Sequence, residues 1–110
     1  MQQLPGFARA VAQTQDPLER LFAIYEAHWE DAERRSWCRR QVRDGISQIP
    51  KNKIDAIRVE VEQLEKKQVV LMAMEPKTEA LRERLFRELD YAILRYCFLQ
   101  DVLLFHRNEK

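Results

Sequence analysis

Residues 85–105 read LFRELDYAILRYCFLQDVLLF, and this stretch decides the fold. Fifteen of its 21 residues are apolar or aromatic. The whole chain of 110 residues holds only two glycines and four prolines, which indicates a few long elements joined by short turns. Because the apolar residues recur with helical spacing and no strand-like alternation is present, we predict an all-α protein.

The apolar residues of this stretch fall on two faces when they are placed on a helix at about 100° per residue. The first face is typical of core packing, and consists of Leu85, Leu89, Ala92, Tyr96, Leu99 and Leu103, flanked by Phe86, Ile93, Cys97 and Leu104. The second face consists of Tyr91, Leu94, Phe98, Val102 and Phe105. Two apolar faces need two partners. One is the chain's own bundle, and the other is either a remaining helix or a second chain. We predict the second face as a dimer interface.

We do not expect this helix to cross a membrane. A spanning helix needs about 20 nearly uncharged apolar residues. Five charged residues interrupt the stretch: Arg87, Glu88, Asp90, Arg95 and Asp101. Each charge near the centre would cost roughly 2.5–3.5 kcal/mol on insertion scales. A buried helix of a non-membrane protein is therefore the better interpretation.

Length and turn signals together predict a single helical domain over residues 1–110. The predicted elements are a short helix over about 3–13 and long helices over about 17–44, 53–75 and 77–107. Short loops place neighbouring helices antiparallel. The predicted architecture is therefore an up-down-up bundle of three long antiparallel helices with a short N-terminal helix.

Local signals support the predicted boundaries. Asp16 followed by Pro17 is typical of a helix start, and Gly45 suits the left-handed position that often follows a helix. Thr78 can cap the last helix. The third helix carries a heptad-like apolar seam at spacings of three and four residues: Ile54, Ile57, Val61, Leu64 and Leu71.

The end of the helix over 17–44 carries a run of cations around one tryptophan. This Arg/Trp cluster consists of Arg34, Arg35, Trp37, Arg39, Arg40 and Arg43. Cations at a helix C-terminus complement the helix dipole, which explains part of the run. However, the apolar face that contains Trp29 continues into Arg39 and Arg43, so either the helix bends near 34–36, its end protrudes, or the arginines line a site. Because arginine binds phosphates and carboxylates in bidentate fashion and tryptophan stacks on bases, the cluster is a candidate anion-binding or partner-binding site.

Catalytic and metal chemistry find little support. His28 and His106 lack the Glu-x-x-His spacing of bundle metal sites. Cys38 lies among arginines that would lower its pKa, but it has no neighbouring base. We therefore expect no cofactor, no metal and no enzymatic activity.

These patterns predict a helical protein–protein interaction or regulatory adaptor module that self-associates as a homodimer through its C-terminal helix and has a protein partner. The alternative is a nucleic-acid-binding regulator that uses the Arg/Trp cluster, which the net charge of +1 disfavours. Cys38 and Cys97 are widely spaced and are read as free thiols. Because no basic run followed by a long apolar stretch opens the chain, we expect no signal peptide and a cytoplasmic location.

Overall fold

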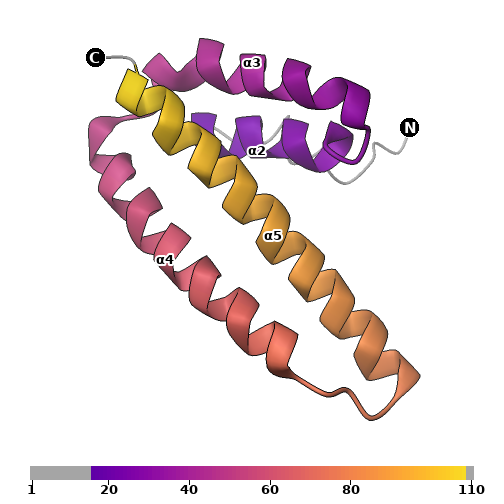
Figure 1. Cartoon of the computed structure of the whole chain (residues 1–110). Helices are drawn as coiled ribbons and strands as arrows, with labels where there is room; N and C mark the ends of the chain where they lie inside the picture. The colour runs from indigo at the N-terminus through magenta and orange to yellow at the C-terminus, as the bar shows by residue number, and fades with distance from the viewer. Residues whose placement is uncertain (1–15, 109–110) are drawn as a thin grey trace, which may run out of the picture.

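A computed structural model describes residues 16–108, and over this range it contains helices and no strand (Figure 1). The elements are listed here in chain order: α2 Pro17–His28, the 3-10 turn η1 Ala32–Arg34, α3 Arg35–Gly45, the 3-10 turn η2 Ile46–Gln48, α4 Lys51–Ala73 and α5 Glu79–Asn108. The all-α prediction is confirmed. The helix predicted over about 3–13 lies outside the described residues.

The predicted long helix over 17–44 is wrong, because the chain breaks it into α2 and α3. Helix α2 begins as predicted, with the Asp16 side chain accepting a hydrogen bond of 2.9 Å from the Leu18 N–H and Pro17 in the first turn. It ends at His28, and Asp31 then adopts an extended conformation and accepts a hydrogen bond from the Glu33 N–H. Helix α3 therefore turns back alongside α2 (Figure 1).

Burial of an apolar line on α3 and η2 explains the break between α2 and α3. Cys38 and Val42 are fully buried in the core, and Ile46 is 2 % exposed. A straight helix would carry these side chains past the end of the bundle into water, whereas the turn at residues 29–34 folds them against α2 and α5. The apolar residues between the arginines therefore determine that the chain turns at residues 29–34.

Gly45 does not take the predicted left-handed conformation. Its φ is −95°, and the chain continues directly into η2. A Cβ atom at this position would lie 3.2 and 3.3 Å from the two terminal carbons of Leu21 on α2. The glycine therefore permits close packing of α3 on α2.

Helices α4 and α5 form a long antiparallel hairpin (Figure 1). The heptad-like seam of α4 is buried as predicted, with the exposed fractions of its five residues between 2 % and 8 %. The Leu81 N–H donates a hydrogen bond of 3.2 Å to the Thr78 hydroxyl at the start of α5, which confirms the predicted cap. Helices α2 and α3 pack across the end of the hairpin that holds the C-terminus of α5, and the far half extends beyond them (Figure 1).

Helix α5 does have two packed faces, and both partners belong to the same chain. The first face contacts α4, where the Tyr96 hydroxyl lies 3.3 Å from a Glu65 carboxylate oxygen. The second face contacts α2, where the Phe98 ring lies 5.2 Å from Phe22 and 5.0 Å from Tyr25 between ring centres.

The predicted dimer interface is therefore wrong for its central residues. Phe98 and Val102 are fully buried in the core of their own chain, because the α2–α3 pair covers this face. Leu94 and Phe105 are half-buried against the same core. Tyr91 remains 49 % exposed, although its ring packs edge-on against Phe22.

Candidate interaction surface

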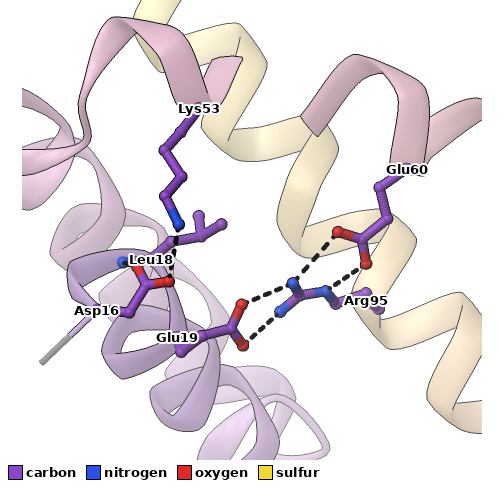
Figure 2. Close-up of polar contacts among 6 residues, drawn as sticks. All are labelled: Asp16, Leu18, Glu19, Lys53, Glu60 and Arg95. Atoms are coloured by element: carbon purple, nitrogen blue, oxygen red, sulfur yellow. Dashed lines mark hydrogen bonds and ion pairs between the residues drawn. The ribbon is translucent and has the colours of Figure 1, made fainter. Parts of the chain in front are cut away.

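A buried arginine joins three of the helices, as Figure 2 shows. Arg95 on α5 donates hydrogen bonds of 3.0 and 2.8 Å to the two carboxylate oxygens of Glu19 on α2. On its other side it donates bonds of 2.9 and 3.3 Å to Glu60 on α4. We call these three residues the Arg95 triad. Bidentate contacts of this kind fix position as well as charge, so the triad sets how α2 and α4 lie on α5.

Arg95 stays charged because the two carboxylates outweigh the cost of its burial. Arg95 is only 7 % exposed, and its guanidinium also lies 4.6 Å from the centre of the Phe22 ring. Burial alone would lower the pKa of Arg95, but the hydrogen bonds and charges of Glu19 and Glu60 raise it overall. The two glutamates are each about two-fifths exposed, so the triad borders on water. It is a structural link, and it offers no open position for a ligand.

A second polar link lies where α2, α3 and α5 meet. The buried Tyr25 hydroxyl donates a hydrogen bond of 2.7 Å to Asp101, and Arg39 lies 3.4 Å from the same oxygen. Burial, together with this hydrogen bond and the Asp101 charge, raises the pKa of Tyr25 far above its ordinary value. Tyr25 is therefore a neutral donor throughout the physiological pH range.

Two arginines of the predicted Arg/Trp cluster pack against a tryptophan of α2. The Trp29 ring stacks on Tyr25 with the ring centres 4.6 Å apart. The Arg35 and Arg39 guanidinium carbons lie 5.1 and 5.0 Å from the centre of the Trp29 ring. Arg35 also donates a hydrogen bond of 2.7 Å to the Trp29 carbonyl at the end of α2. These cations stabilise the turn between α2 and α3.

The rest of the cluster is spread around α3. Trp37 lies roughly 160° around the helix from Arg35 and Arg39, with its ring edge-on to His28. Arg34 donates a hydrogen bond of 3.0 Å to His28 and pairs with Asp31. Arg43 lies 3.5 Å from Asp44, and Arg40 forms no ion pair with any described residue. The structure thus does not bring the six predicted residues together on one surface.

The pKa of the Cys38 thiol also differs from the expectation. Its side chain is fully buried, and its thiol lies 4.0 Å from the Ile24 carbonyl. Burial raises the pKa of the Cys38 thiol, against the smaller opposite effect of Arg34 and Arg39. The arginines act in the predicted direction, but burial outweighs them, so the predicted net lowering of the Cys38 pKa is wrong.

A third apolar line along α5 is largely exposed. Phe86 is 55 % exposed, Ile93 40 % and Leu104 50 %, and Cys97 between them is half-buried. We call these four residues the α5 stripe. The stripe lies roughly 140° around the helix from Phe98 and Val102. Near its middle it borders α2 and α3, because Ile93 lines an open pocket together with Trp29 and Arg35. The predicted place of the stripe residues was the edge of the core face.

Further exposed apolar residues gather at the far half of the hairpin. There Met72 and Phe86 line an apolar groove of about 460 Å³ between α4 and α5, together with residues of the connecting turn. Other exposed apolar side chains in this half of the hairpin are Val69, Val70, Met74 and Leu81. The groove continues the surface that begins at the α5 stripe, so the uncovered face of the hairpin is the best candidate for an interaction surface.

Other kinds of site find no support in the part of the chain that the structure describes. Residues 16–108 contain no group of three or more side chains arranged to hold a metal ion, and every buried side-chain nitrogen or oxygen there has a hydrogen-bond partner. None of the described helices is long and apolar enough to cross a membrane. Comparisons of the chain with protein-family models, with curated proteins and with solved structures found no match.

Sequence reasoning missed both the Arg95 triad and the exposure of the α5 stripe. Arg95 stands between the apolar pairs Ile93–Leu94 and Tyr96–Cys97, and a charge in such a place signals a buried partner. The stripe has its own signal, since Phe86, Ile93, Cys97 and Leu104 are spaced by seven, four and seven residues. Neither pattern predicts which residues it contacts unless the packing of α2 against α5 is known.

Proposed function

We propose that this chain is a non-enzymatic helical interaction module, of regulatory or adaptor type, that self-associates through α5. The contact surface is the α5 stripe with the adjoining Met72 groove. The observation that carries the proposal is the half-exposed line of Phe86, Ile93 and Leu104 on a helix that buries Phe98 and Val102 on another side. A cytoplasmic location belongs to the same proposal, since both cysteines are free thiols.

The size of this surface fits reversible association. Each of these three side chains has roughly half its surface still to bury, which is worth about 1 kcal/mol apiece. A symmetric pair would bury six such side chains, against an association cost of at least about 4 kcal/mol. We therefore expect a dimer that forms and dissociates with protein concentration.

Charge also favours a second copy as the partner. The segment 77–90 carries four basic residues and four acidic residues, so two copies of this region do not repel each other. The Arg/Trp cluster supports the nucleic-acid alternative less well, because Arg35 and Arg39 are packed against Trp29 and Trp37 points to another side of α3.

The test is multi-angle light scattering on size-exclusion chromatography with the wild type, Ile93→Glu and Val59→Glu. Val59 is a matched control, because it is 53 % exposed on α4 and lies outside the α5 stripe. We expect Ile93→Glu to be monomeric at concentrations where the wild type and Val59→Glu are dimeric, with unchanged helical circular dichroism. Equal masses for all three proteins would contradict the proposal. A salt-sensitive gel shift with RNA or DNA would favour the nucleic-acid alternative.

A further inference from the structure

The α5 stripe belongs to a longer seam with coiled-coil spacing. Six positions of α5 follow one another at intervals of four and three residues: Phe86, Asp90, Ile93, Cys97, Gln100 and Leu104. All six are exposed or half-buried. This alternation keeps residues on one side of a helix over several turns and is the pattern by which two helices pack along each other.

The seam is symmetric about position 95. When two identical antiparallel helices are related by a twofold axis, residues equally far before and after the centre face each other. With the centre at 95, Phe86 faces Leu104 of the other copy, and Ile93 faces Cys97. Asp90 faces Gln100. Apolar residues therefore meet apolar residues, and the two polar positions meet each other.

We infer that two copies pack their α5 helices antiparallel along this seam, in the register centred on Arg95. This inference rests on the proposed self-association and adds its geometry. The polar pair favours this orientation: the Gln100 amide donates one hydrogen bond of 2.9 Å to Tyr96 within the chain and has a second N–H for Asp90 of the other copy. A parallel pair in register would place the two Asp90 carboxylates together, which is unfavourable.

Charges beside the seam agree with the same register. Glu83 and Arg107 are equally far from position 95 and have opposite charges. Both are exposed, and neither forms an ion pair with a described residue. In the antiparallel pair each Glu83 lies beside Arg107 of the other copy, once at each end of the interface. Polar and charged positions of this kind commonly set the orientation of paired helices.

The six seam positions stay accessible beside α2 and α3. These helices bury Phe98 and Val102 on another side of α5. Trp29 and Arg35 border the seam at Ile93 around an open pocket and leave Ile93 exposed. Because the pair is antiparallel, the far half of each hairpin lies beside the C-terminal half of the other α5. Phe86 and Leu104 are the two ends of the stripe. In the pair, residues near Leu104 of one copy cover the exposed Phe86 of the other.

Disulfide formation under copper–phenanthroline oxidation tests the register. We expect the Ile93→Cys variant to form a covalent dimer, because position 93 faces Cys97 of the other copy. The wild type should form little, since two Cys97 residues would be offset by about 6 Å along the helices, too far for easy bridging. Arg87→Cys, an exposed position off the seam, is the matched control and should not react beyond the wild-type level.

Charge exchange gives a second measurement that leaves the fold untouched. Glu83→Arg and Arg107→Glu should each weaken association about fivefold, and the double variant should restore it. A covalent dimer of the wild type through Cys97, or a double variant that is weaker than both single ones, would overturn the register while self-association stands. A wild type that stays monomeric at all concentrations would overturn self-association itself.

Discussion

Phe86 and Phe98 lie on the same helix about 120° apart, yet Phe86 is 55 % exposed and Phe98 is fully buried. The difference arises because α2 and α3 cover Phe98, whereas Phe86 lies on another side of α5 and in the half of the hairpin that extends beyond them (Figure 1). Phe86 belongs to a line of apolar residues that ends at Leu104 on the uncovered side. Helix α5 thus has three apolar lines, of which two are packed within the chain and one is largely exposed.

The Arg95 triad should contribute strongly to stability. We expect Arg95→Met to lower the free energy of unfolding by about 2–3 kcal/mol, because it leaves Glu19 and Glu60 facing each other without a cation. Arg95→Lys should lower the free energy of unfolding by more than about 1 kcal/mol, since lysine cannot make both bidentate contacts. Urea unfolding measures both values.

Arg87→Lys is the matched control for the triad, because Arg87 is exposed on the same helix. This substitution should change the free energy of unfolding by no more than about 0.5 kcal/mol. If Arg95→Lys were as stable as Arg87→Lys, the triad would not hold α2 and α4 on α5.

Tyr25 should make stability depend on alkaline pH. Burial and the bond to Asp101 raise the pKa of Tyr25 above its ordinary value of 10.0, so the folded chain holds the proton more tightly than the unfolded chain does. The resulting stability is fully present below about pH 10 and is lost as pH rises above that value. We expect Tyr25→Phe to be less stable by about 1 kcal/mol at neutral pH.

The difference between the wild type and Tyr25→Phe should shrink above pH 10, because only the wild type loses this contribution. Urea unfolding at a series of pH values checks this result. A difference that stays constant up to pH 11 would show that Tyr25 ionises no differently in the folded chain.

Cys97 reports on the α5 stripe without any substitution. Burial, and to a smaller extent the Asp101 charge, raise the pKa of its thiol above 9.0, so alkylation by iodoacetamide should be slow at pH 8 and faster in alkali. If α5 pairs with a second copy, the alkylation rate should also fall as protein concentration rises. In urea the rate should not depend on concentration. Rates that are the same in dilute and concentrated native protein would mean that the stripe is not covered.

The helical class, the seam of α4 and the starts of α2 and α5 could be predicted from sequence, because each depends on local signals. Asp16, Pro17 and Thr78 act within one turn of their own helix, and the spacing from Ile54 to Leu71 repeats regularly. These signals need no knowledge of distant residues.

The break between α2 and α3 could not be predicted so simply, because favourable charge pairs continue through it. Arg34 and Arg35 follow acidic residues at helical spacing, which supports a continuous helix. Only the burial of Cys38, Val42 and Ile46 requires the turn. That turn also placed α3 beside α2 against α5, where the pair buries Phe98 and Val102.

Sedimentation equilibrium of the wild-type chain, over a concentration range from low micromolar to several hundred micromolar, tests the central claim most directly. We expect a single reversible monomer–dimer equilibrium that Ile93→Glu abolishes and Val59→Glu leaves unchanged. A monomer of unchanged mass over the whole range would contradict self-association through α5.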